Sequence, residues 1–431
     1  MKDISLLSSE NITYDVIIIG AGIAGITTSK VLKENGISYI ILEANDKLGG
    51  RAKKAPKNFG KWFDLGCSYL HNGDTNPLVK ILESKSAPVV KSKGNMFSIE
   101  KTNFLFNGFP ASANKIKSIK KADEQFRNKL SHAAKDSFDQ ALSSCLEKGS
   151  PLYPILFNHL TGLNGIEPHF VSIKDYAKVK DGPDFYIESG LANVIEKWGS
   201  GLNVRFNCPV HQVSWAGNEI QVETNETLFK AKKLLVTTST GVLGNNIINF
   251  FPSLPSYKTG AIHNLPMGIL NKVGVLFKSE TFQISDEGWY VTGIQDEREK
   301  IFSIMSYEIR TKPLNHMIIF FGGTEGKELE NAPEGFFTRI RSVLSKTFGD
   351  AFQERITKFI HSSWGLNDFT LGSYSYALPG TNNDRELLQK SLENKLFFAG
   401  EATSEYHYGT CHGAYLSGIQ AAKEIISERD N

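Results

Sequence analysis

The chain has 431 residues, of which 40% are hydrophobic and 22% charged, a composition typical of a globular protein large enough for two cored domains. Its net charge of +2 gives no general attraction to nucleic acid, and its four scattered cysteines argue against a zinc site or a disulfide framework, so no protein metal is expected. No apolar run could span a membrane, and neither 1–5 nor 428–431 carries a targeting signal, so we expect a cytoplasmic protein.

The first predicted element is a buried strand over 16–19 that turns tightly into a helix over 23–35. Glycines in such a turn let the backbone approach a pyrophosphate, whose charge then lies on the amides at the helix N-terminus. The sequence therefore predicts a dinucleotide site here. The residues that we assign to it are Gly20, Gly22, Ala24 and Gly25.

The next apolar run, residues 39–42, ends at Glu43, where a carboxylate can hydrogen-bond a ribose hydroxyl. Gly49, Gly50 and Arg51 follow, and an arginine behind two glycines can reach a diphosphate with a planar fork of donors. Strand, glycines, acid and G-G-R together resemble the FAD-binding amine oxidase family. The resemblance implies FAD as the dinucleotide; the alternative for Arg51 is an ordinary loop with a solvated side chain.

Residues 65–78 are similar to the second flavin-contacting loop of that family, in which Gly66 would contact the cofactor. In polyamine-oxidising relatives an acidic or histidine side chain of this loop meets the far amine of the substrate, and His71 occupies that neighbourhood. A hydrogen-bonded structural histidine fits the sequence equally well, and both interpretations stay open. No arginine follows Arg51 in this region, which argues against the carboxylate-binding site of amino-acid oxidases.

The middle of the chain changes pattern twice. Residues 111–160 favour helix, and another helix is predicted over 188–198. Short strands are then predicted at 204–206, 210–215, 220–224 and 233–238. These strands resemble the part of the flavin domain that covers the adenine, where the family makes a backbone contact at the position of Val210.

After Pro266 the sequence predicts strands at 273–277, 289–292 and 317–321, and then a helix over 334–348. Segment 264–273 resembles the family's G-x-x-x-K segment, whose lysine, here Lys272, holds a water against flavin N5. A lysine within an apolar run must be partnered or desolvated, and its ammonium could stabilise charge on an oxygen intermediate. The alternative is a strand-edge lysine that reaches solvent.

Trp364 and Tyr374 match family positions that face the flavin, where electron-rich rings guide an amine by cation–π contact. The second tyrosine of the amine cage in many monoamine and plant polyamine oxidases is replaced here by Thr410. At that position the chain is nearer to polyamine oxidases and lysine-specific histone demethylases. The position of Ser373 is cysteine in enzymes that attach the flavin covalently, so we expect dissociable FAD.

The last segment, which contains a strand that starts near 395 and a helix that runs through Glu424, matches the carboxyl-terminal signature of the family. The strand ends at Gly400, and Glu401 and Thr410 would face the cofactor. The positive end of the helix would lie near the flavin, where negative charge develops on reduction.

We therefore expect an α/β fold with a discontinuous Rossmann-like FAD-binding domain (1–80, 185–265 and 385–431) and a second, α+β substrate-binding domain (81–184 and 266–384). The resemblance implies an amine oxidase, closest to polyamine oxidases, that converts an amine to an imine and aldehyde while O2 becomes H2O2. An L-amino-acid oxidase, or another flavin oxidoreductase of this fold, stays open; Arg310 is one candidate for binding a carboxylate. A non-catalytic protein like the prenyl-GTPase dissociation inhibitors is the other alternative.

Overall fold

The computed structural model describes residues 8–60, 62–85, 88–94, 98–298, 300–381 and 383–427. The terminal segments in which the sequence shows no targeting signal, 1–5 and 428–431, lie outside these residues. Within the described ranges, no helix combines the length and the apolar character needed to cross a bilayer.

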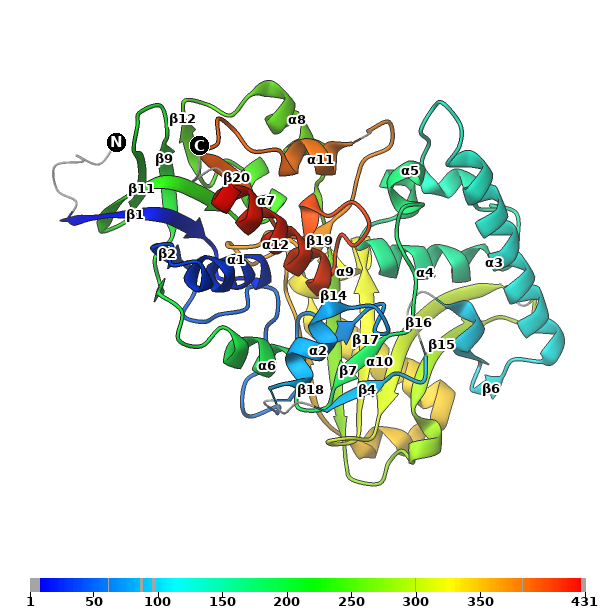
Figure 1. Ribbon diagram of the computed structural model, residues 1–431. Coiled ribbons are helices and arrows are strands. Elements are labelled where there is room, and N and C mark those ends of the chain that lie inside the picture. The colour runs from blue at the N-terminus through cyan, green and yellow to red at the C-terminus, as the bar shows by residue number, and fades with distance from the viewer. Residues whose placement is uncertain are drawn as a thin grey trace.

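The first sheet is built around a parallel β–α–β unit at the N-terminal end of the chain (Figure 1). Its strand order is β12-β9-β10-β11-β1-β2-β8, and β20 pairs with β11. Val16–Ile19 are buried because helices cover the parallel part of the sheet. The strands are β1 (Ser8–Ile19), β2 (Tyr39–Leu42), β8 (Val204–Arg205), β9 (Val210–Ser214), β10 (Ile220–Thr224), β11 (Thr227–Val236), β12 (Asn249–Phe251) and β20 (Leu396–Phe398).

Two helices from opposite ends of the chain, α1 (Ile23–Glu34) and α12 (Cys411–Ser427), pack against each other beside this sheet (Figure 1). Their backbones approach closely because Gly418 has no side chain: a Cβ there would lie 2.7 Å from the Ala24 carbonyl oxygen. Thr28 Oγ1 donates to the Gly418 carbonyl oxygen at 2.9 Å. The N-termini of both helices are thereby held on the same side of the sheet.

The second sheet lies at the lower centre of Figure 1 and has the order β18-β14-β17-β16-β15-β5-β6. The helices α9 (Gly323–Asn331) and α10 (Pro333–Phe348) share a hydrophobic core with it. The strands are β5 (Thr102–Phe106), β6 (Phe109–Pro110), β14 (Leu270–Phe277), β15 (Gly288–Gln295), β16 (Ile301–Arg310), β17 (His316–Gly322) and β18 (Ile356–His361).

The remaining elements flank or connect the two sheets. Two small sheets have the orders β3-β7-β4 and β13-β19. Their strands are β3 (Tyr69–Leu70), β4 (Val89–Lys91), β7 (Phe185–Ile187), β13 (Met267–Gly268) and β19 (Tyr374–Ser375). The helices are α2 (Pro77–Glu83), α3 (Ala113–Ala133), α4 (Tyr153–Asn164), α5 (Ile173–Tyr176), α6 (Leu191–Trp198), α7 (Thr240–Gly244), α8 (Ser256–Asn264) and α11 (Asp384–Gln389).

Most predicted elements agree with the structure to within a few residues. The helical pattern predicted over 111–160 corresponds to two separate helices, because α3 ends at Ala133 and α4 begins only at Tyr153. Gly149 and Pro151 lie in the intervening segment, and both residue types interrupt helices. Strand β16 was not predicted, because Ser303, Ser306 and Glu308 break up the apolar run of this central strand.

Candidate functional site

One cavity of about 330 Å³ collects nearly all the predicted site residues. Its size lies within the range of small-molecule sites. The ends of β1 and β2 contribute to its wall, and so do β14 and β17 of the second sheet. The predicted residues that line it are Gly20, Gly22, Ala24, Glu43, Gly49, Gly50, Arg51, Gly66, His71, Val210, Lys272, Trp364, Tyr374, Gly400, Glu401 and Thr410.

The turn between β1 and α1 presents backbone to this cavity. Gly22 caps α1 without a side-chain hydrogen bond, and a Cβ at Gly22 would have no atom within 4 Å. The first amides of a helix have no partner within the helix, so they form a site for a negatively charged group. Gly25, predicted to bind the cofactor, does not line the cavity: a Cβ there would lie 2.1 Å from the Gly20 carbonyl oxygen, so Gly25 permits the tight turn itself.

Glu43 lies at the end of β2 and is buried at the cavity wall. Its Oε2 accepts from the Ala21 amide at 2.6 Å, and its Oε1 accepts from the Asn45 amide at 2.9 Å. The carboxylate is thus held in a fixed orientation beside the glycine turn. A carboxylate oxygen has more than one acceptor site, so Glu43 retains capacity for a ligand hydroxyl.

Arg51 and Glu401 join the two ends of the site. Arg51 Nη1 donates to Glu401 Oε1 at 2.7 Å and to the Ser373 carbonyl oxygen at 3.1 Å. Burial acts to raise the pKa of Glu401, but the Arg51 cation and the surrounding donors outweigh it, and the pKa is lowered overall. Glu401 is therefore ionised at neutral pH. We expected Arg51 to bind a diphosphate, but its guanidinium also binds Glu401 and the Ser373 carbonyl oxygen.

Lys272 is an interior residue of the second sheet, because β14 pairs with β17 on one side and with β18 on the other. The alternative of a strand-edge lysine that reaches solvent is wrong: the side chain is buried, and Nζ donates to the Gly66 carbonyl oxygen and to Ser68 Oγ. Burial lowers the pKa of Lys272 to about 8. Lys272 lines the cavity, and its side chain changes from ammonium to amine near pH 8.

Three of the aromatic residues that line the cavity are Trp364, Tyr374 and Tyr408. The Tyr374 hydroxyl donates to the Gly162 carbonyl oxygen at 2.9 Å, which fixes its ring. Thr410 uses its hydroxyl locally, since Oγ1 donates to the His407 carbonyl oxygen and accepts from the Gly413 amide. Thr410 therefore does not supply a ring, but Tyr408, two residues before it, is one of the other tyrosines that line the cavity.

His71 lines the cavity and contacts a buried carboxylate. Its Nδ1 lies 2.7 Å from Oδ1 of Asp184, which is fully buried. The contact orients the ring and is compatible with both interpretations of His71, a structural histidine and one that meets an amine. Asp184 was not predicted, because it comes from a distant segment just before β7 and carries no motif of its own.

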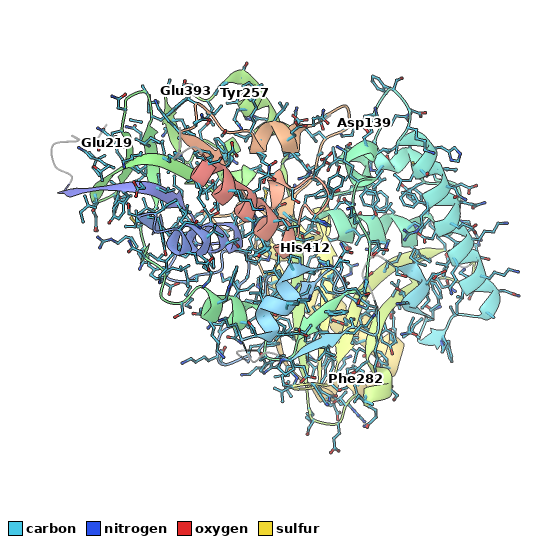
Figure 2. All side chains as sticks on the ribbon, viewed as in Figure 1. Asp139, Glu219, Tyr257, Phe282, Glu393 and His412 are labelled. Atoms are coloured by element: carbon cyan, nitrogen blue, oxygen red, sulfur yellow. The ribbon has the colours of Figure 1, made fainter. Side chains whose placement is uncertain are left out.

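Sequence reasoning also missed other cavity residues. Asp368 and Phe369 are exposed residues that also line the cavity, and the only sequence signal was their position between Trp364 and Tyr374. His412, near the start of α12, is labelled close to the middle of the molecule in Figure 2 and lines the cavity too. Among the described residues, no three His, Cys, Asp or Glu side chains are arranged to hold a metal ion.

Arg310, a candidate for binding a substrate carboxylate, is not among the cavity residues. Its Nε donates to Glu308 Oε2 at 2.8 Å, and its guanidinium lies 4.0 Å from the centre of the Tyr186 ring. Within the described ranges, Arg51 is the arginine that lines the cavity, and it is paired with Glu401. The pairing of Arg310 is therefore structural.

The chain is similar to known proteins over almost its whole length. Flavin containing amine oxidoreductases, as a family, match residues 23–426 of the chain. Polyamine oxidase 4 of Oryza sativa subsp. japonica is 28% identical over 438 residues, which cover 95% of this chain and 88% of that protein. Probable polyamine oxidase 4 of Arabidopsis thaliana is 26% identical over 443 residues, which cover 96% and 87%.

Lysine-specific histone demethylase 1 homolog 2 of Arabidopsis thaliana is 27% identical over 466 residues, which cover 97% of this chain but 59% of that protein. The extent of the family match confirms the resemblance that the motifs predicted, and with it the cofactor, noncovalently bound FAD. The chain belongs to the family of flavin containing amine oxidoreductases.

Proposed function

We propose that this oxidoreductase is an FAD-dependent amine oxidase that acts on a polyamine-like substrate, with O2 as acceptor and H2O2 as product. The observation that carries the proposal is the common cavity. It brings the glycine turn and Glu43 together with Lys272 and the aromatic residues Trp364 and Tyr374. A dinucleotide site and an aromatic amine site thus share one chamber.

Each group has a role that follows from its position. When bound, FAD would supply the redox chemistry, the oxidation of the carbon next to the amine and the transfer of the electrons to oxygen. The amides at the N-terminus of α1 would hold the pyrophosphate, and Glu43 would hold the ribose. Trp364 and Tyr374 would orient the amine through their ring faces. Lys272 would hold a water and stabilise negative charge during the oxygen step.

The two sheets suggest which part of the chain binds the cofactor and which binds the substrate. The strands of the first sheet all come from the segments expected to form the Rossmann-like domain, 1–80, 185–265 and 385–431, and those of the second sheet from 81–184 and 266–384. We assign cofactor binding to the first part and substrate binding to the second. Labelling of the whole protein with a photoreactive flavin tests this assignment, because it identifies the residues that contact the cofactor. The two parts need not be expressed separately.

The polyamine-like substrate is supported by polar groups that line the same cavity as the aromatic residues. His71 and Asp368 both line the cavity, and Asp368 is exposed. A second ammonium of an extended substrate would meet these groups while the first lies between the rings. A cytoplasmic location remains a prediction that imaging of the tagged full-length chain would test.

The decisive experiment is an amine panel in a peroxide-release assay with the purified yellow protein. We expect turnover with di- and polyamines, and release of all the flavin on acid precipitation. A panel that also contains L-amino acids and a methyl-lysine peptide separates the alternatives. Turnover of amino acids alone would indicate an amino-acid oxidase, and a colourless protein without turnover would indicate a non-catalytic binding protein.

A further inference from the structure

Tyr408 lines the cavity, and a buried arginine stacks on its ring. The central carbon of the Arg385 guanidinium lies 3.6 Å from the centre of the Tyr408 ring, within the range of a cation–π contact. Arg385 is 2% exposed and, unlike Tyr408, is not one of the residues that line the cavity. One face of the Tyr408 ring is therefore covered by the protein interior.

Arg385 itself is fixed by several hydrogen-bond partners. Its Nε and Nη2 donate to the two carboxylate oxygens of Asp175, at 2.8 and 2.9 Å. Its Nη1 donates to Ser375 Oγ at 2.9 Å and to the Ala402 carbonyl oxygen at 3.1 Å. A bidentate pair fixes the plane of a guanidinium, and the carboxylate compensates its charge within the protein. Arg385 is therefore a rigid support for the Tyr408 ring.

The residues around Tyr408 also contact the tyrosine that we expect to orient the amine. Ser375, which accepts from Arg385, follows Tyr374 in β19. Gly409, which follows Tyr408, lies against the Tyr374 ring, because a Cβ at Gly409 would be only 3.4 Å from Tyr374 Cδ2. Tyr408 is therefore close to the expected position of the amine.

The Tyr408 hydroxyl is available to a ligand. It has no hydrogen-bond partner among the residues that the structure describes, whereas the Tyr374 hydroxyl donates to the Gly162 carbonyl oxygen. The Tyr408 oxygen is also not among the described polar atoms that are enclosed without a partner, so it reaches open space. Burial of the side chain raises the pKa of this hydroxyl well above its usual value. A neutral hydroxyl of this kind can accept a hydrogen bond.

We propose that Tyr408 is a specificity-determining residue whose hydroxyl accepts a hydrogen bond from an N–H of the substrate amine, and that Arg385 positions its ring. This inference rests on the proposed amine oxidation and specifies which amines the site selects. Hydride loss from the carbon next to nitrogen needs the nitrogen lone pair, which forms the C=N bond, so the reactive amine is neutral. A neutral secondary amine retains an N–H for Tyr408, and a neutral tertiary amine has none. The site should therefore favour primary and secondary amines.

The test compares a secondary amine with its N-methyl tertiary counterpart in the peroxide-release assay, with the full-length holoprotein. Tyr408→Phe removes only the hydroxyl oxygen. It should lower kcat/KM for the secondary amine about 5- to 10-fold, the effect of one hydrogen bond, and leave kcat/KM for the tertiary amine unchanged. If the tertiary amine is not turned over, its inhibition constant against the secondary amine gives the same comparison.

The matched control for the hydroxyl is Tyr415→Phe, at a half-buried tyrosine of α12 that does not line the cavity. This variant should keep the secondary-to-tertiary ratio of the parent. An unchanged ratio in Tyr408→Phe, or an equal loss for both amines, would overturn the proposal.

Arg385→Lys tests the positioning role. Lysine keeps the charge but cannot bind both oxygens of Asp175 or present a planar face to the ring. We expect the secondary-to-tertiary ratio to fall as in Tyr408→Phe, and the double variant with both substitutions to show no further fall. A further fall in the double variant, or an unchanged ratio in Arg385→Lys, would contradict the role. If Arg385→Lys does not fold, Asp175→Asn provides the same comparison.

Arg339→Lys is the control for a stacked and paired arginine, because Arg339 donates to Glu325 and lies away from the cavity lining. It should keep the ratio of the parent. The inference and the proposed function fail in different ways. If the parent oxidises amines but Tyr408→Phe keeps the ratio, amine oxidation stands and the Tyr408 contact does not. If the parent oxidises no amine, the proposed function fails, and the inference fails with it.

Discussion

Arg51 and Glu401 form an ion pair, with Nη1 2.7 Å from Oε1, that joins the first and last motifs of the chain across one cavity. The Glu401 carboxylate also accepts from the Ser375 amide and hydroxyl and from the Gly409 amide. An ionised carboxyl with this many donors organises several segments at once. The pair therefore fixes the cavity wall independently of any direct contact with the cofactor.

We expect Glu401→Gln to lower the free energy of unfolding by about 2–3 kcal/mol at pH 7, less than for a fully buried pair because Arg51 is partly exposed. The carboxylate pKa is lowered in the folded state, so its contribution is present above the unfolded pKa and disappears as pH falls through the folded pKa. Urea unfolding at several pH values measures this. Glu405→Gln, at a more exposed ion pair with Lys178, is the control. An equal effect at both positions would contradict the assignment.

Glu43 offers a direct test of the cofactor site. Glu43→Gln keeps an oxygen that can accept from the Ala21 amide but removes the charge that strengthens hydrogen bonds to a ribose. The lost bonds are worth about 1.5–3 kcal/mol, which corresponds to roughly a 10- to 150-fold weaker FAD affinity. Fluorescence titration of the flavin-free protein measures the affinity. Unchanged binding would show that Glu43 serves only to hold the Ala21 and Asn45 amides.

The sequence was sufficient to predict the β1–α1–β2 unit and a set of site residues that all line the cavity except Gly25, because each motif carries its own local signal. The Arg51–Glu401 pair was not predicted, since both residues had been assigned separately to the cofactor. The Asp184 partner of His71 was also missed. Such contacts join segments far apart in the chain, and no local spacing encodes them.

The same limit applies to Lys258, a fully buried lysine of α8 that had no motif. Its Nζ donates to the carbonyl oxygens of Leu387, Leu388 and Lys390 at the end of α11, and lies 4.3 Å from the centre of the Phe398 ring. Burial lowers its pKa to about 7. A hydrophobic pattern alone would predict an apolar residue here, since the carbonyls that accept from Lys258 become visible only in the fold.

This lowered pKa predicts a pH dependence of stability. Between about pH 7 and the unfolded pKa of 10.5, the unfolded chain binds a proton at Lys258 that the folded chain does not, so stability rises with pH. Relative to Lys258→Met, the parent should gain up to about 1.4 kcal/mol per pH unit over this range. Urea unfolding from pH 7 to 9 measures the difference. Lys47→Met, at an exposed position, should run parallel to the parent; a parallel course for Lys258→Met would refute the assignment.

Substitution of His71 distinguishes a contact with the substrate from a purely structural role. If the ring meets the second ammonium of a polyamine, His71→Gln should raise KM for polyamines about tenfold, a loss of about 1.4 kcal/mol, and leave KM for monoamines unchanged. Steady-state kinetics with a matched pair of amines measures the ratio. His263→Gln, on the exposed side of α8, is the control. Equal changes for both amines would instead support the structural role through Asp184.

Lys272→Met tests the group closest to the proposed chemistry. The substitution keeps an apolar stem but removes an ammonium that would stabilise charge during reaction with oxygen, so we expect roughly 10²-fold slower reoxidation with little change in amine affinity. Because the pKa of Lys272 is about 8, the ammonium form predominates below that pH. The reoxidation rate of the parent should therefore fall as pH rises through about 8, whereas the variant should be flat.

Stopped-flow mixing of the reduced enzyme with oxygen measures this step apart from amine oxidation. Lys258→Met is the matched control, because Lys258 is also a buried lysine with a lowered pKa but does not line the cavity. It should reoxidise at the parent rate and retain the parent pH profile. If both variants slow equally, the effect comes from loss of packing. If Lys272→Met reoxidises at the rate of the parent protein, Lys272 has only a structural role, in which it joins β14 to Gly66 and Ser68.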